Sequence, residues 1–192
     1  HEMAANSLLV RVGALYHDVG KLKNPGMFIE NQGGHFNPHD NMPPEESAEV
    51  IRRHVSDGLE LAKKYGIPAI VSEFMRTHHG HSLIFFFYKK AVEMYGQENV
   101  DPDDYRYDYR KPVSKEEAIL MICDSVEAAS RSLKTITEKN ISELVASVVE
   151  RQTKDGQFDD AEISYREINR LKVLLTEKLL EIYHSRIEYQ AD

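Results

Sequence analysis

Tyr16-His17-Asp18-Val19-Gly20-Lys21 is the stretch from which the rest of this chain can be interpreted. It sets an imidazole beside a carboxylate, and similar groups follow at predicted helix ends or edges: His54, His78, His79 and Asp124. Imidazole nitrogens and carboxylate oxygens are ligands that divalent iron and manganese accept, and no thiolate cluster competes with them. A lone histidine on an apolar face is usually a core residue, but six groups of this kind predict a metal site.

Helix signals dominate the remaining sequence. Capping boxes predict helices that begin at Ser114, Asn140 and Ser164. A proline pair followed by two glutamates opens another helix at 43–44, whose apolar stripe continues until Tyr65-Gly66-Ile67-Pro68 ends it. Further helices are expected over about 6–17, 68–78 and 82–95. Only residues 84–88 have strand-like composition, and they run into a helix-compatible segment, so the predicted class is all-α.

Two segments resist helix formation. Residues 24–44 carry prolines and glycines directly after the His17-Asp18 pair, and loops of this length are usually functional or disordered. Residues 99–112 contain alternating tyrosines, among them Tyr107. These rings could stack on a nucleotide base, or they could simply help to pack the loop.

Length, composition and net charge limit the classes of protein to which this chain can belong. At 192 residues with 41% hydrophobic residues, it fits a single domain over 1–192 with a proper core. A single cysteine, Cys123, and the lack of a signal peptide or spanning segment suggest a reducing, cytoplasmic setting. The net charge of -8 argues against binding of long nucleic acid, but a small anionic ligand remains open because bound cations can reverse the field in a pocket.

The number of candidate ligands favours two metal ions over one. In such sites the ions share a bridging hydroxide and clamp a scissile phosphate, and Asp18, with two oxygens, is the expected bridge. Because a helix turns about 100° per residue, neighbouring ligands converge only where a helix ends. Gly20 and Gly80 stand at those places.

Two cations are candidates for substrate contact. Lys21 could reach a phosphate oxygen, or it could be a solvated lysine after a helix. Arg131 shares a helix face with Asp124 at a distance of roughly 10 Å along the axis, which suits a contact to a second phosphate or a base. Pairing of Arg131 with Glu127 on the surface is the alternative.

These residues resemble the HD-domain phosphohydrolases. The narrower likeness is to the cytosolic HD domain of the seven-transmembrane (PgpH-type) cyclic di-AMP phosphodiesterases of bacterial signalling. Four segments carry it: Leu15-Tyr16-His17-Asp18-Val19-Gly20-Lys21, Phe28-Ile29-Glu30-Asn31-Gln32, Asn37-Pro38-His39-Asp40 and His78-His79-Gly80. The cyclic di-GMP hydrolases instead have Gly-Tyr-Pro after their paired histidines, where this chain has Gly80-His81-Ser82.

The resemblance implies an HD-domain helical bundle with both irregular loops at the active site. It implies that His17, Asp18 and Asp124 hold one ion and that Asp18, His54, His78 and His79 hold the other. The ions would be iron or manganese, and the product would be the linear dinucleotide pApA, formed by a hydroxide that the two metals activate. His39 would line or support the pocket, and the parent protein would be membrane-tethered with this domain in the cytosol.

One departure from the family pattern concerns an upstream helix with a further metal-binding histidine. His1 is too close to His17 to take that position and looks like a tag remnant. The first ion is therefore expected to bind more weakly here than in a longer chain.

Other functions remain open at this point. The chain could be an HD hydrolase of another nucleotide, such as cyclic di-GMP, a deoxynucleoside triphosphate or guanosine tetraphosphate. It could also be a cyclic-dinucleotide sensor without turnover, or a structural helical domain with buried histidines. The apolar stripe of the terminal helix, from Ile168 to Ile182, could pack on the domain or form a homodimer.

Overall fold

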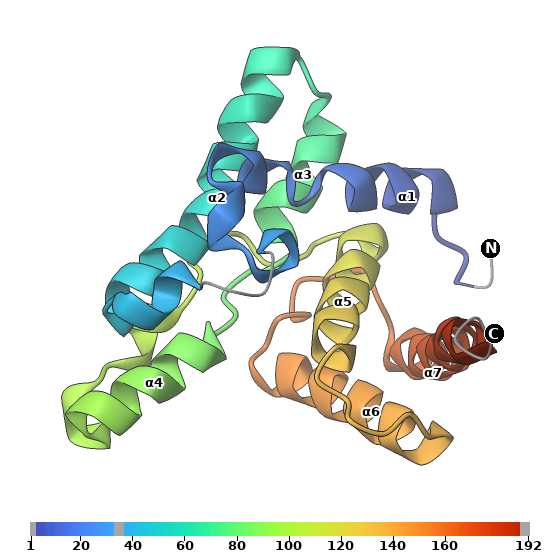
Figure 1. Ribbon diagram of the computed structural model, residues 1–192. Coiled ribbons are helices and arrows are strands. Elements are labelled where there is room, and N and C mark those ends of the chain that lie inside the picture. Colours follow the sequence, from blue (N-terminus) through green and yellow to red (C-terminus); the bar gives the residue numbers. More distant parts are fainter. Residues whose placement is uncertain (1–2, 33–36, 189–192) are drawn as a thin grey trace. The chain divides into compact units, whose positions relative to one another are not determined.

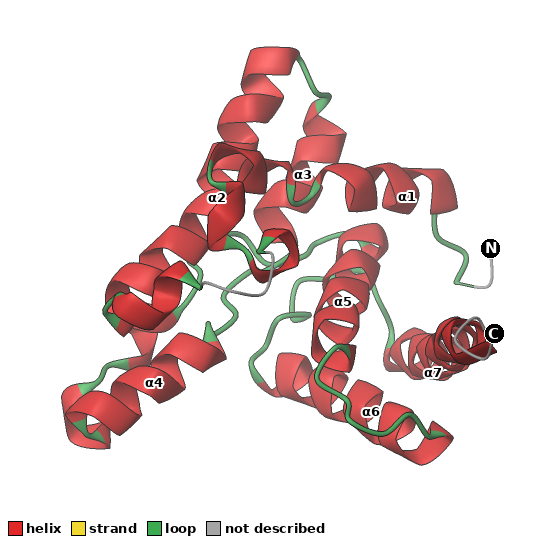
Figure 2. Cartoon of the chain, in the orientation of Figure 1, coloured by secondary structure: helices red, strands yellow, loops and turns green. Residues whose placement is uncertain are grey.

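The structure is a computed structural model that describes residues 3–32 and 37–188, with side chains through residue 183. Seven α-helices dominate these residues, and the extended pairing seen among them is one isolated antiparallel bridge, Leu83 with Arg106 (Figures 1 and 2). The helices are α1 Ser7–Tyr16, α2 Pro44–Tyr65, α3 Ala69–Thr77, α4 Phe85–Tyr95, α5 Lys115–Ser130, α6 Glu138–Lys154 and α7 Tyr165–Glu188. The predicted all-α class is confirmed.

The chain divides into two compact units. One is Arg11–Arg110, and the other combines His1–Val10 with Lys111–Asp192. The expectation that residues 1–192 act as a single domain stays a prediction.

Helix α2 is the central element of the unit Arg11–Arg110. It begins at Pro44, carries Glu45 and Glu46 in its first turn, and ends at Gly66 with a left-handed φ of 67°. Acidic residues near a helix N-terminus and a glycine after its end both favour these boundaries. The apolar stripe that the sequence predicts on this helix faces the interior, as shown by the burial of Ala48, Val55 and Ala62.

Gly20 allows a close approach of two backbones. It lies in a 3-10 turn, Val19–Lys23, and a side-chain Cβ at this position would overlap the carbonyl oxygen of His54 in α2. The absence of a side chain therefore lets the segment that follows Asp18 pack directly on α2 beside His54. Gly20 serves this contact, and it is Gly80, with φ of 50°, that has the left-handed backbone of a sharp turn.

Two predicted helix starts are wrong. Helix α4 begins at Phe85 and not at Ser82, because residues 82–84 pair with another backbone segment: Ile84 N–H donates to Tyr105 O at 2.8 Å. Helix α6 begins at Glu138 with Thr137 as its cap, and Asn140 donates its backbone N–H to that threonine at 3.1 Å.

Helices α5, α6 and α7 form the apolar core of the second unit. The predicted caps of two of them are confirmed: Ser114 and Glu117 form a capping box on α5, and Ser164 with Glu167 does so on α7. Within the stripe of α7, Ile168, Leu171 and Leu179 are buried and Leu175 packs partly against the core, whereas Ile182 is 46% exposed.

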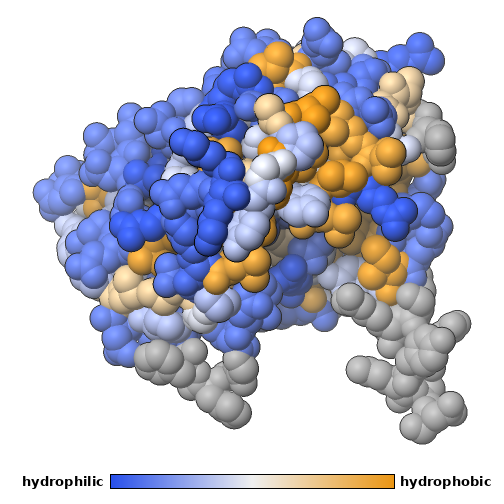
Figure 3. All heavy atoms as spheres, turned by 90° about the horizontal axis from the view of Figure 1, so that it is seen from above, coloured by the Kyte–Doolittle hydropathy of each residue, from blue (hydrophilic) through white to orange (hydrophobic). Residues whose placement is uncertain are grey.

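The two segments predicted to be irregular contain short 3-10 turns in their described parts. Residues 33–36, which include two of the glycines noted in the first segment, lie outside the described residues. In the part of the chain that the structure describes, no helix has the length and apolar character needed to cross a membrane. The surface view shows apolar side chains among mostly hydrophilic ones (Figure 3). The exposed large apolar residues include Leu15, Leu22 and Ile70.

Candidate metal centre

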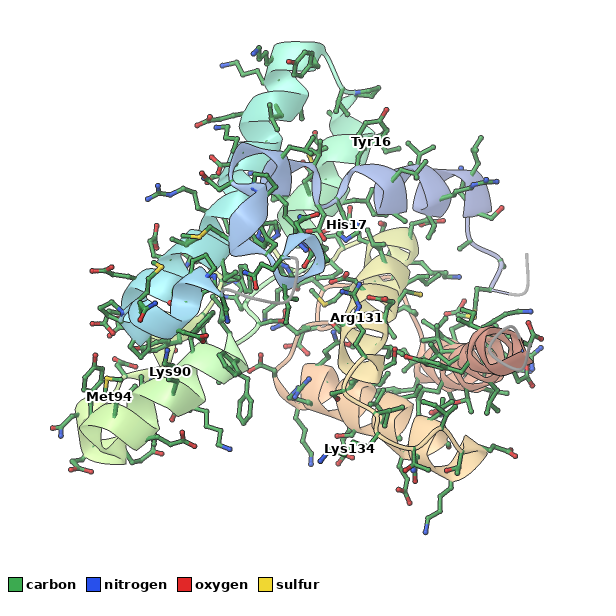
Figure 4. The ribbon with its side chains drawn as sticks, viewed as in Figure 1. Tyr16, His17, Lys90, Met94, Arg131 and Lys134 are labelled. Atoms are coloured by element: carbon green, nitrogen blue, oxygen red, sulfur yellow. The ribbon has the colours of Figure 1, made fainter. Side chains whose placement is uncertain are left out.

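Five of the six predicted ligands belong to the unit Arg11–Arg110, where they lie at the end of α1, within α2 and at the end of α3. His17 follows the last residue of α1, as labelled in Figure 4, and Asp18 comes next. His54 lies within α2, while His78 caps the C-terminus of α3 and His79 follows it. The two pairs of neighbouring ligands thus stand at helix ends, as the sequence predicted.

The Asp18 carboxylate lies at the centre of this set. One of its oxygens, Oδ2, is 3.3 Å from His17 Nε2. The other, Oδ1, is 3.3 Å from His54 Nε2 and 3.7 Å from His78 Nε2. Imidazoles from three different elements therefore converge on one carboxylate, which presents an oxygen to each side.

Backbone carbonyls orient three of the imidazoles. His17 Nδ1 faces Ala14 O at 2.9 Å, and His54 Nδ1 faces Ile51 O at 2.6 Å. His78 Nδ1 faces Met75 O, also at 2.9 Å. A carbonyl only accepts, so each Nδ1 must carry a proton and donate it. In a neutral ring this leaves the Nε2 lone pair directed at the centre, which is how histidine ligands are prepared for a metal.

The centre as built requires positive charge. His54 Nε2 and His78 Nε2 are only 3.1 Å apart and both rings are almost fully buried. If both rings are neutral with protons on Nδ1, two lone pairs face each other beside a carboxylate. Either a proton or a metal ion must lie among these atoms, so the donor set fits a divalent cation.

The pKa values of the centre favour a cation over protons at neutral pH. Burial, followed by the charge of His78, lowers the pKa of His54 to about 4. Burial and the neighbouring His78 and His54 also hold the pKa of His79 well below its usual range. Burial raises the pKa of Asp18, but the adjacent His17 and His78 imidazoles and the Lys21 ammonium outweigh it and hold the carboxyl pKa well below its ordinary value.

One subset already has the spacing of a ligand group. His54, His78 and His79 each offer one nitrogen, and these atoms lie within 4.8 Å of one another. An ion between them would meet three imidazoles, with Asp18 Oδ1 next to two of them. The residues described therefore include groups that could hold a metal ion.

Lys21 is not a solvated lysine. Its ammonium is 2.7 Å from Asp18 Oδ2 and 2.6 Å from Glu30 Oε1, and it lies 5.3 Å from the centre of the Phe28 ring. Burial lowers the pKa of Lys21, but the two carboxylates more than compensate and raise it. Glu30 lies in one of the segments that carry the family resemblance, and no local sequence pattern predicts its contact with Lys21, nine residues away.

Asp124 and Arg131 belong to the other unit. Asp124 is half-buried on α5, next to Cys123, and its assignment as a ligand stays a prediction. Burial, with a smaller effect of the Asp124 charge, raises the thiol pKa of Cys123 to about 11, which agrees with an inert, packed cysteine. Arg131, which is labelled in Figure 4, is exposed. It makes two hydrogen bonds to Glu127, at 3.0 and 2.8 Å, which is the alternative that the sequence left open.

The structure gives His39 and Tyr107 buried positions. His39 is 5% exposed, its Nε2 bonds Met27 O at 2.9 Å, and its own carbonyl accepts from Lys90 of α4, so it ties the first irregular segment to that helix. This geometry favours support of the site over direct contact with substrate. Tyr107 is 5% exposed and stacks on His79, with ring centroids 4.1 Å apart. Substrate contact by either residue stays a prediction.

The chain matches known proteins over nearly its whole length. It is 42% identical to the cyclic-di-AMP phosphodiesterase PgpH of Bacillus subtilis over 187 residues, which are 97% of this chain and 26% of that protein. The PgpH protein of Listeria monocytogenes is also 42% identical, over 191 residues, again with 26% of the relative covered. The chain therefore spans about a quarter of the length of the curated relatives it matches.

A solved structure shares the fold. The crystal structure of the Listeria monocytogenes PgpH HD domain in complex with cyclic di-AMP matches with a TM-score of 0.90 and 42% identity, over 95% of this chain and 84% of that one. The HD domain family model matches residues 1–129, which include all six predicted ligands. By sequence and by structure, this chain belongs to the HD domain family.

Proposed function

We propose that this chain is a metal-dependent phosphodiesterase domain that opens cyclic di-AMP to pApA with two divalent ions, iron or manganese. One observation carries the proposal: buried imidazoles from α2 and α3 direct Nε2 atoms at the two-sided carboxylate of Asp18. The choice of substrate is based on the relatives, since proteins named cyclic-di-AMP phosphodiesterase are 42% identical to this chain across almost all of its length.

Each ligand has a defined task in this proposal. His54, His78 and His79 would hold one ion, and His17 and Asp124 would hold the other. Asp18 would serve both ions, because one of its oxygens faces His17 and the other faces His54 and His78. When bound, such a pair of ions lowers the pKa of a water and neutralises charge on the phosphate. The anionic state of Asp18 and the neutral state of His54 keep both residues able to ligate at neutral pH.

Lys21 acts on the phosphodiester and not on the ions. Its ammonium is held between Asp18 and Glu30, and it keeps its charge because both carboxylates raise its pKa. A cation fixed beside the bridging carboxylate can donate to a non-bridging phosphate oxygen and stabilise the charge that develops there. Glu30 then serves as the residue that positions Lys21.

The test is turnover of cyclic di-AMP by the purified chain with saturating Mn²⁺, followed by chromatography. We expect pApA as the product, and faster turnover than with cyclic di-GMP. Asp18→Asn should reduce turnover by more than about 100-fold, the upper range for loss of a residue that merely supports a ligand. His81→Gln, an exposed histidine close in sequence to the site, is the matched control and should retain activity. If the chain binds cyclic di-AMP at saturating metal but forms no pApA, the proposal of an enzyme is wrong and the chain is a cyclic-dinucleotide sensor.

We also propose that the domain is the cytosolic part of a longer, membrane-tethered protein. Support comes from the length of the relatives, of which the matched region makes up 26%. We propose further that α7 forms a homodimer through the face that carries the exposed Ile182. Sedimentation of the chain, with an Ile182→Lys variant as comparison, tests it, because a dimer through this face should dissociate in the variant.

A further inference from the structure

His79 lacks the anchor that the other imidazoles have. The rings of His17, His54 and His78 are fixed by Nδ1–H bonds to carbonyls three residues earlier in their own helices. His79 lies beyond the last residue of α3, and no hydrogen bond within the described part of the chain orients its ring. A ligand ring that can rotate binds an ion less tightly, because the ion must then order it.

An aromatic ring occupies the place of the missing hydrogen bond. Tyr107 stacks on His79 with a centroid distance of 4.1 Å and an angle of 18° between the ring planes. The centroid of the His54 ring lies 5.1 Å from that of His79, with the two planes nearly perpendicular, and the His78 centroid lies 4.0 Å away with its plane tilted by 45°. A nearly parallel stack restricts rotation of the imidazole about the Cβ–Cγ bond, since rotation would drive it into the phenol ring.

The backbone keeps Tyr107 in register with His79. Tyr107 N–H donates to Ser82 O at 3.0 Å, and Tyr109 N–H donates to Gly80 O at 3.2 Å. The segment after the paired histidines is thereby fastened to the second irregular segment, on both sides of the stacked ring. The same pairing is what delays the start of α4 until Phe85.

We infer that Tyr107 is a positioning residue, which fixes the His79 imidazole for metal binding by stacking on it. This inference rests on the proposed metal-binding role of His79. It differs from base stacking, the role that the sequence suggested, because one face of the ring is already covered by His79 and only 5% of the residue is exposed.

Two variants and a matched control test the inference. Tyr107→Leu removes the ring, Tyr107→Phe keeps the stack, and Tyr105→Leu removes an equally buried tyrosine of the same segment, which packs on Tyr88 and not on a histidine. We expect Tyr107→Leu to weaken Mn²⁺ binding by about 10-fold, the lower range for loss of a residue that orients a ligand. Tyr107→Phe and Tyr105→Leu should bind Mn²⁺ as the unmodified chain does.

A second measurement needs neither metal nor turnover. In NMR spectra of the metal-free chain, the His79 ring protons should be shifted upfield by the Tyr107 ring and show contacts to it. The upfield shift should persist in Tyr107→Phe and vanish in Tyr107→Leu. This readout separates the inference from the proposed function, since it holds even if cyclic di-AMP is not hydrolysed.

Three results would overturn the inference. The first is a His79 spectrum without contacts to Tyr107 in the unmodified chain, which stays decisive even if Tyr107→Leu does not fold. The second is equal loss of Mn²⁺ affinity in Tyr105→Leu and Tyr107→Leu, which would indicate loosening of the segment. The third is a raised KM for cyclic di-AMP in Tyr107→Leu with unchanged Mn²⁺ affinity, which would restore the base-stacking role.

Discussion

The two units of this chain use their interiors differently. The unit containing α5, α6 and α7 buries aliphatic residues such as Ile122, Ile141 and Val145, and none of its buried side chains that the structure describes is a histidine. The unit Arg11–Arg110 also has an apolar cluster, but it buries His39, His54 and His78 as well. Burial of ionisable groups opposes folding unless they are paired or ligate a cation.

The contrast separates a unit that is stabilised by its aliphatic core from a unit that contains the candidate metal site. The aliphatic core gains free energy from the removal of apolar surface from water, without any cofactor. The histidine centre brings lone pairs and a carboxylate together at 3.1–3.7 Å, which is favourable only with a cation or protons among them. The stability of the unit Arg11–Arg110 should therefore depend on metal and on pH. The stability of the other unit should instead depend on how well its aliphatic side chains fill the core.

The largest expected effect is that of metal removal. Ligand binding at about 1,000 times its dissociation constant stabilises a fold by about 4 kcal/mol. Chelation should therefore lower the free energy of unfolding by about that amount. Urea titrations with Mn²⁺ and with chelator measure it. In His78→Ala the difference between the two titrations should largely vanish, and a chelator effect of equal size in that variant would contradict the contrast between the units.

A cavity in the aliphatic unit should act without metal. Ile141 has no exposed surface, so Ile141→Ala should cost about 2–5 kcal/mol of stability. The affinity for Mn²⁺ at His54, His78 and His79, which all belong to the other unit, should equal that of the unmodified chain when it is measured by calorimetry below the melting temperature. A weakened affinity would show that the two interiors are not independent.

Acid should destabilise the metal-free histidine centre. Because the pKa of His54 falls to about 4 in the folded chain, the unfolded chain binds more protons between about pH 6.5 and 4. Stability is therefore lost as the pH falls through this window, by on the order of 3 kcal/mol. Urea midpoints at pH 7, 5.5 and 4 with chelator measure the slope. In His54→Gln the dependence of the urea midpoint on pH should become weaker. An unchanged dependence in that variant would show that the protons taken up on unfolding bind to other residues.

The smallest effect concerns the lysine beside the centre. Glu30→Gln removes one of the two carboxylates that hold Lys21, so kcat for cyclic di-AMP should fall by about 10-fold while Mn²⁺ affinity stays unchanged. Glu60→Gln is the control, because Glu60 pairs with Lys23 outside the centre. Equal activity of both variants would show that Lys21 does not need Glu30.

The contrast between the units also separates what sequence could predict from what it could not. Local signals sufficed for helices that begin at Ser114 and Ser164, because a cap and its glutamate are only three residues apart. They failed at Asn140, since the neighbouring Thr137 is a competing cap that accepts from Asn140 itself. At Ser82 they failed because a distant segment pairs with the backbone there.

The helix-end positions of the candidate ligands could be predicted from the sequence, but the surroundings of these residues could not. Helix-end positions placed His17 and His78 correctly, because the geometry of one helix decides them. The partners of Lys21 and His79 depend on irregular segments whose path no periodicity encodes: Glu30 follows nine residues later and Tyr107 twenty-eight. The carbonyl anchors could have been inferred, since each lies three residues before its histidine.

Anomalous diffraction from crystals grown with Mn²⁺ and cyclic di-AMP tests the central claim most directly. We expect one ion bound by His54, His78 and His79, a second ion beside His17, and coordination of both ions by Asp18. Crystals at saturating Mn²⁺ with no anomalous peak within bonding distance of these imidazoles would contradict it.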